Sequence, residues 1–217
     1  MTKPLSPLVG ISATRTAATG PRWTLLAGLS LALLAMAALI LACMPDASGM
    51  RQLIRATART SLLLFVLAFT ASAQARLWPG AWSQWLCRQR RQLGLAVAVS
   101  HAIHAGAIVG FALLDPLSFQ VHLVQSNPVP GYIGYAFIVA MAATSFDRSA
   151  AWLGPRAWRW LHVGGVYFLW VSFMVTFGKR LPQSGAYAVP LLILLAALGL
   201  RLWPAPVRLT PGPGRAA

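Results

Sequence analysis

The most regular feature of the chain is a series of long apolar stretches separated by short polar or basic segments. A helix needs about 20 mostly apolar residues to cross the hydrocarbon core of a bilayer. Six stretches approach or reach this length, and the six predicted spans cover residues 23–43, 60–77, 93–114, 132–146, 157–177 and 186–203. The pattern therefore predicts an all-α integral membrane protein, a six-helix bundle over residues 23–203.

The composition strengthens this interpretation and predicts what lies outside the bundle. The 217 residues are 58% hydrophobic and only 10% charged, and the mean hydropathy of +0.66 is far above that of a soluble domain. Residues 1–22 and 204–217 are instead rich in Thr, Pro, Ser and Gly. We expect these two segments to be disordered cytoplasmic tails.

The net charge of +15, from 18 Lys and Arg residues against three acids, would indicate nucleic-acid binding in a soluble protein. In an apolar chain it indicates membrane topology and contact with anionic lipid, so we expect no nucleic-acid partner. Placing both termini in the cytoplasm puts thirteen basic residues inside and five outside. The positive-inside rule then predicts a multi-pass protein of the bacterial inner membrane with both termini cytoplasmic.

One basic group conflicts with this topology. Arg51, Arg55 and Arg59 recur every four residues and form a stripe on the outer side of the second span. Such a stripe is either a helix end whose arginines extend toward the head groups or a docking site for an anionic group. The sequence leaves both interpretations open.

Histidines supply the candidate chemistry. His101 and His104 lie three apart in the third span and would share a helix face, and His162 lies in the fifth span. Titratable groups are expensive in hydrocarbon, so each is a functional hypothesis by default. Counted from the expected helix starts, His101 and His162 both lie about 10 to 12 Å deep and His104 about 15 Å deep. Depth favours His101 with His162 as a pair and does not exclude His104, because helix ends are uncertain by a turn.

Two helices with inward-facing imidazoles are suited to bind a haem iron from both sides. We therefore predict a haem b site, with His101, His104 and His162 as candidate metal ligands. Gly164 and Gly165 would let a flat ring approach the fifth span, although such glycines also serve ordinary helix packing. The candidate partners for the haem propionates are three arginines at the inner ends of these helices, Arg91, Arg156 and Arg159. Alternatively, these arginines only mark the cytoplasmic side of the membrane under the positive-inside rule.

The segments RRQLGLAVAVSHAIH and ATSFDRSAAWLGPRAWRWLH resemble the ferric reductase-like transmembrane domain family. This family includes the haem-binding membrane subunits of methionine sulfoxide reductase systems and, more distantly, the membrane domains of NADPH oxidases. The similar region covers about residues 51–177. The resemblance implies that His104 and His162 are haem ligands. The family commonly has a further histidine where this chain has Val175, so a second haem is in doubt and His104 lacks its usual partner.

These features together predict a membrane b-type cytochrome that relays electrons across the inner membrane to a partner acceptor. We expect one haem b, no flavin or nicotinamide domain in the chain, and an electron donor that is a quinol or a separate flavoprotein. Two alternatives stay open: a haem-free scaffold or assembly protein of the same fold, favoured by Val175, and a small permease subunit. His122 is expected at the surface, and Cys43 and Cys87 are expected to be unpaired structural residues.

Overall fold

The computed structural model describes residues 23–125 and 127–204. The predicted tail 1–22, and residues 205–217 of the predicted C-terminal tail, lie outside the described residues. Within the described part, every regular element is a helix, and the prediction of an all-α membrane bundle is confirmed. In chain order the elements are α1 (Thr24–Cys43), α2 (Ala47–Leu77), α3 (Ala81–Leu114), α4 (Pro116–Gln125), α5 (Val129–Ala143), α6 (Asp147–Leu153), α7 (Pro155–Gly178), the 3₁₀ turns η1 (Leu181–Gln183) and η2 (Gly185–Tyr187), and α8 (Ala188–Leu202).

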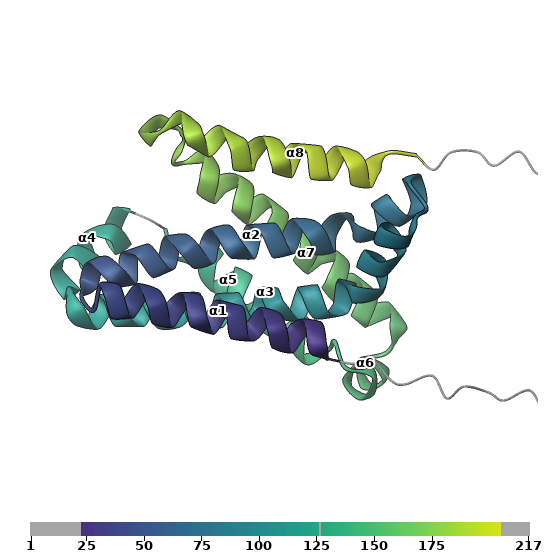
Figure 1. Cartoon of the computed structure of the whole chain (residues 1–217), viewed down its shortest axis with the longest axis horizontal. Helices are drawn as coiled ribbons and strands as arrows, with labels where there is room; N and C mark the ends of the chain where they lie inside the picture. Colours follow the sequence, from purple (N-terminus) through teal and green to yellow (C-terminus); the bar gives the residue numbers. More distant parts are fainter. Residues whose placement is uncertain (1–22, 126, 205–217) are drawn as a thin grey trace, which may run out of the picture.

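The long helices run across the bundle and the short ones cap its two ends (Figure 1). In the described part of the chain, five helical segments are long and apolar enough to cross a membrane, and α5 with α6, bent by 111°, makes up to six. The first turn of α1 and the last turn of α8 lie at the same end (Figure 1), as an even number of crossings requires. We call this the α6 end and the opposite one the α4 end. The chain is therefore a multi-pass membrane protein.

Two helices extend beyond the spans expected from hydropathy, and a third forms between two expected spans. α2 begins at Ala47 and includes the arginine stripe, and α3 begins at Ala81 and includes a tryptophan-rich segment that lies outside the predicted spans. The expected loop after Asp115 contains α4. Hydropathy misplaces these ends because arginine and glutamine are good helix formers and their side chains reach water from a continuing helix.

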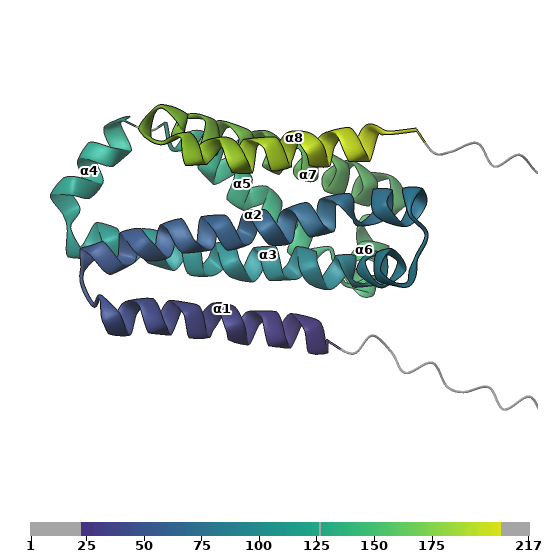
Figure 2. The same cartoon turned by 45° about the horizontal axis from the view of Figure 1, so that its top comes forward.

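The antiparallel pair α2 and α3 forms the centre of the bundle, with α1 on one side and α8 on the other (Figure 2). Small hydroxyl side chains hold this pair together. Ser61 donates to Ser100 at 2.8 Å, and Ser100 donates to the carbonyl of Thr57 at 3.2 Å. All three residues are fully buried. Small residues let the two backbones approach closely, and the hydrogen bonds satisfy hydroxyls that no water reaches.

Aromatic side chains fill the space between α2 and α7. Phe65 contacts Phe173 at 5.3 Å between ring centroids and Phe69 at the same separation, and Phe69 meets Tyr167 edge-on. Arg201 of α8 places its guanidinium 4.5 Å from the Phe69 ring and donates to the Phe69 carbonyl. This cluster joins α2, α7 and α8.

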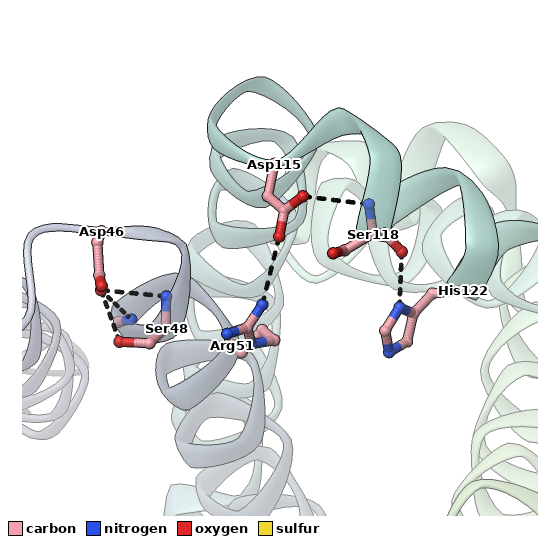
Figure 3. A network of polar contacts seen from close by, with 7 residues as sticks. Asp46, Ser48, Arg51, Asp115, Ser118 and His122 are labelled. Atoms are coloured by element: carbon pink, nitrogen blue, oxygen red, sulfur yellow. Dashed lines mark hydrogen bonds and ion pairs between the residues drawn. The ribbon is translucent and has the colours of Figure 1, made fainter.

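At the α4 end, polar contacts fix the two helix turns (Figure 3). Asp46 caps α2 by accepting from the backbone N–H groups of Ser48 and Gly49. Arg51 forms an ion pair with Asp115 at 3.6 Å, and Asp115 accepts from the Ser118 N–H. Hydrogen bonds from Ser48 lower the pKa of Asp46, and hydrogen bonds from Ser118, together with the charge of Arg51, lower the pKa of Asp115.

The network predicts a loss of stability in acid. Because both folded-state pKa values lie below the usual carboxyl value of about 3.9, the ionised carboxylates stabilise the fold above that pH. Their contribution is lost as the pH falls through the lowered pKa values. Because both carboxylates are accessible to solvent, we expect only a modest fall in the thermal midpoint of the detergent-solubilised protein below about pH 4. The Asp46→Asn/Asp115→Asn variant should show a shallower fall, and an unchanged acid profile would contradict this assignment.

His122 lies on α4 with its ring exposed, as predicted; its Nδ1 lies 2.7 Å from the Ser118 carbonyl and its ring meets Phe111 edge-on. Cys43 and Cys87 are both free, which agrees with their expected unpaired state. They lie at opposite ends of the bundle, at the last residue of α1 and in the second turn of α3.

The two adjacent glycines of α7 face different surroundings. A Cβ atom on Gly165 would lie 2.7 Å from the Met141 sulfur and 3.0 Å from Phe137, both on α5, whereas a Cβ on Gly164 would meet nothing within 4 Å. Gly165 therefore permits the close packing of α5 on α7.

This contrast gives a matched pair of variants. Gly165→Val should destabilise the protein by about 1–3 kcal/mol because it overpacks the α5–α7 contact. Gly164→Val has the same helix propensity change and open space around it. Thermal or denaturant unfolding in detergent measures both, and equal losses of stability would contradict the packing role of Gly165.

Candidate functional site

His101 lies midway along α3, where the apolar residues of the third span keep the helix inside the bundle. Its Nδ1 is 3.0 Å from the Val97 carbonyl oxygen, which can only accept, so Nδ1 carries the proton. The ring meets Tyr135 of α5 and Phe173 of α7 edge-on, at 5.9 and 6.1 Å between centroids. The remaining nitrogen, Nε2, is then the basic one. This is the state in which a metal-binding imidazole is held by a backbone carbonyl.

A pocket of about 520 Å³ lies between α3 and α5 and includes His101. This volume is within the usual range for cofactor and small-molecule sites. One wall is formed by three alanines spaced one turn apart on α3, Ala98, Ala102 and Ala105, and the opposite wall by α5. Apart from His101 and Tyr135, the lining residues are all apolar. The pocket thus offers a mostly apolar space lined by one imidazole and one tyrosine.

His104 lies one turn beyond His101, with the two rings 6.0 Å apart. Its Nδ1 is 2.9 Å from the hydroxyl oxygen of Thr57 on α2, and that hydroxyl lies 2.6 Å from the Leu53 carbonyl. If Thr57 donates to Leu53, it accepts from His104, which again leaves Nε2 as the basic nitrogen. His104 lines a different, smaller pocket that faces α7 and η2.

His162 lies in the second turn of α7 and contacts the end of α5. Its Nε2 is 3.1 Å from the Thr144 hydroxyl oxygen, and its ring stacks on Trp158 at 4.2 Å. The Trp158 indole in turn donates to the Thr144 carbonyl at 2.9 Å. These contacts fix the ring at the α6 end of α5. In this arrangement Nε2 is engaged by Thr144, and ligation through Nε2 requires the ring to leave that hydroxyl.

The structure does not place His162 beside His101. The α7 residue that contacts His101 is Phe173, eleven residues further along the helix, or about 16 Å at 1.5 Å per residue. The expectation of equal depth is therefore wrong. It assumed that the third span begins near residue 93, whereas α3 begins at Ala81, about three turns earlier. Val175, at the position of the family's further histidine, lies next to Thr176, which shares the smaller pocket with His104.

The three arginines predicted to pair with the haem propionates have different surroundings. Arg91 forms an ion pair with Asp147 at 3.0 Å, and its guanidinium lies 5.6 Å from the Phe146 ring, which lines the larger pocket. It is therefore close to the α6 end of that pocket. Arg156 and Arg159 lie in the first two turns of α7 and are exposed. Of the two glycines proposed to admit a flat ring, Gly165 is covered by α5 and Gly164 is open.

Sequence reasoning missed the hydroxyl and aromatic residues that orient the three imidazoles. Thr57, Thr144 and Tyr135 come from α2 and α5, which the histidine pattern did not connect with α3 or α7. Thr144 belongs to the Thr-Ser pair within the family-like segment, and this pair was the available signal for its contact with His162. Thr57 and Tyr135 had no comparable signal, because which helix faces the histidines depends on packing.

The fold and the site together define a class: a multi-pass α-helical membrane protein with three partly buried histidines near its pockets. Comparison with known proteins narrows this class. The chain is 28% identical over 158 residues to the protein-methionine-sulfoxide reductase heme-binding subunit MsrQ of Ralstonia nicotianae, covering 69% of each chain. This likeness supports the resemblance to the ferric reductase-like family at a modest level. No protein-family profile and no solved structure matches the chain.

Proposed function

We propose that the protein is a membrane b-type cytochrome subunit that holds one haem b in the pocket between α3 and α5 and relays electrons to a partner protein. The observation that carries the proposal is the state of His101: its Nδ1 is satisfied by Val97, and it lines a 520 Å³ apolar pocket. The likeness to a subunit whose name describes it as heme-binding supports the same cofactor.

The residues present fit the group in chemistry and space. An imidazole with a free Nε2 is a good axial ligand, and a low-dielectric pocket with few polar atoms keeps water from the iron. When bound, haem supplies one-electron redox chemistry. His101 would bind the iron, the alanine wall of α3 would admit the ring, and Arg91 would pair with a propionate near Phe146. His104 and His162 are further candidate ligands, and Arg156 and Arg159 further candidate partners for the propionates.

Orientation and partners belong to the same proposal. In the topology predicted from the sequence, thirteen of the 18 basic residues fall on the side of both termini, which supports an inner-membrane protein with cytoplasmic termini, the α6 end inside and the α4 end outside. The electron donor would be a quinol or a separate flavoprotein, and the acceptor a protein outside the membrane. Tyr135 and the apolar pocket wall would also suit a quinone ring, although the imidazole favours haem.

A haem-free scaffold of the same fold is the second candidate. Two observations favour it: Val175 replaces the family's further histidine, and Thr144 engages His162. In that case the three histidines would serve only to hold helices together through hydrogen bonds.

The ligand assignment is tested by single His→Ala variants of residues 101, 104 and 162, expressed with haem supplied. The proposal predicts a b-type Soret and alpha band in the reduced-minus-oxidised spectrum of the wild type. It also predicts that His101→Ala lowers haem content by at least about tenfold. A tenfold change in the dissociation constant corresponds to only about 1.4 kcal/mol of binding free energy, and loss of the iron–imidazole bond should cost at least that much. Haem retained in this variant and lost in His104→Ala would overturn the assignment to His101. A colourless wild type would favour the scaffold or a permease.

A second test fills the pocket and leaves every histidine in place. Ala105→Phe should occupy space that the ring requires and lower haem content, since Ala105 is part of the alanine wall. Val109→Phe, an exposed position on the same helix outside the pocket, is the matched control. Haem absorbance per protein, with circular dichroism as the folding check, measures both. Equal haem content in the two variants would place the cofactor elsewhere.

A further inference from the structure

The smaller pocket, at the α4 end, brings together three arginines from two separate segments. Arg55 and Arg59 come from α2, and Arg180 follows the last residue of α7. The pocket measures about 90 Å³, and Tyr187 of η2 and His104 also line it. The Tyr187 hydroxyl interacts with both Arg180 and Arg59. Groups distant in the sequence therefore converge on one small concave surface.

Within residues 23–125 and 127–204, no side-chain carboxylate pairs with the arginines of this pocket. The full sequence has only three acids, and each one has another role. Asp46 caps α2, Asp115 pairs with Arg51, and Asp147 pairs with Arg91. Of the arginine stripe on α2, the first member is thus neutralised and the other two are not.

The contacts of the pocket arginines with the rest of the chain are neutral. Arg55 donates to the side-chain oxygen of Gln52 at 3.1 and 3.2 Å, and Arg59 and Arg180 share the Tyr187 hydroxyl. Arg55 and Arg59 are four residues apart on one helix face, where like charges destabilise the helix. An anion in the pocket would reverse this repulsion into attraction. Guanidinium groups are well matched to phosphate, because they present several donors in a fixed plane.

The position of the pocket indicates which kind of anion would reach it. α2 has 31 residues and is about 46 Å long, whereas the hydrocarbon core is about 30 Å thick. Its first turns therefore extend to the head-group level at the α4 end, and the long side chains of Arg55 and Arg59, in its third and fourth turns, can extend toward that level. Arg180 and Tyr187 lie between α7 and α8 at that same end. The positive-inside rule does not account for basic residues there, since this is the end away from both chain termini.

We propose that Arg55, Arg59 and Arg180 bind the phosphate group of an anionic membrane lipid, with the Tyr187 hydroxyl as an additional donor. Ile54 and Phe177 supply apolar surface beside the arginines for the upper part of an acyl chain. The excess positive charge favours a lipid with net negative charge over a zwitterionic one. The site shares only His104 with the proposed function, where this residue is a further candidate ligand, and it stands apart from the haem assigned to His101.

The test is native mass spectrometry of the purified full chain in detergent, titrated with phosphatidylglycerol or with phosphatidylcholine. The wild type should bind phosphatidylglycerol more tightly than phosphatidylcholine. Arg55→Gln/Arg59→Gln should raise the dissociation constant for phosphatidylglycerol by at least about tenfold, since hydrogen bonds to charged groups are the strong ones. Arg180→Gln should have the same effect. Because Arg180 is not on α2, this variant tests the site even where the double variant of α2 folds poorly. Lys179→Gln removes the same charge beside the pocket and should change nothing.

Three outcomes would overturn the proposal. The arginine variants could bind phosphatidylglycerol as the wild type does. Millimolar inorganic phosphate could displace the lipid completely, which would make the site one for a soluble oxyanion. The variants could keep the lipid and lose haem absorbance, which would assign the arginines to propionates. Titrating His101→Ala with the same lipid separates the two proposals, because that variant should bind phosphatidylglycerol normally whether or not it holds haem.

Discussion

The structure depends on one constraint of the bilayer: every polar group placed between the membrane faces needs a partner inside the protein. The α2–α3 pair satisfies this constraint with small hydroxyl side chains. Ser61 donates to Ser100, and Ser100 donates to the Thr57 carbonyl, so these hydrogen bonds join the two helices where their backbones lie close together. The position of α3 in turn places His101 and His104, and the other helices pack around this pair. Weakening this hydroxyl contact would shift α3, and with it His101 and His104, without changing any candidate ligand itself.

The same constraint explains why each of the three histidine rings has a hydrogen-bond partner inside the protein. Val97 fixes His101 from its own helix, Thr57 fixes His104 from α2, and Thr144 engages His162 from α5. The first two arrangements present Nε2 as the basic nitrogen and the third uses Nε2 itself. A helix–helix hydrogen bond and an axial ligand therefore compete for the same atom only at His162. This difference favours His101 and His104 over His162, and the larger pocket beside His101 is the reason for preferring His101 as the iron ligand.

The arginines are under a related constraint, because few carboxylates are present to pair with them. With only three carboxylates in the sequence, most arginines must be satisfied by carbonyls, aromatic rings, lipid or ligand. Arg201 bonds the Phe69 carbonyl and covers its ring, whereas Arg51 and Arg91 take the carboxylates at opposite ends of the bundle. The arginines left over at the α4 end are those that line the smaller pocket. A lipid phosphate there would complete the pattern of neutralisation.

The sequence by itself determined the fold class, the approximate spans and the residues with unusual chemistry, because apolar length and the cost of a histidine in hydrocarbon are local properties. It also placed Arg51, Arg55 and Arg59 on one face, since their spacing is that of a helix. Only the tertiary structure decided how α3 and α7 align, and it replaced His162 with Phe173 as the neighbour of His101. It likewise separated Arg51, paired with Asp115, from the two arginines that face Arg180. Helix register and ion pairing depend on side chains distant in the sequence, and hydropathy carries no information about which of them meet.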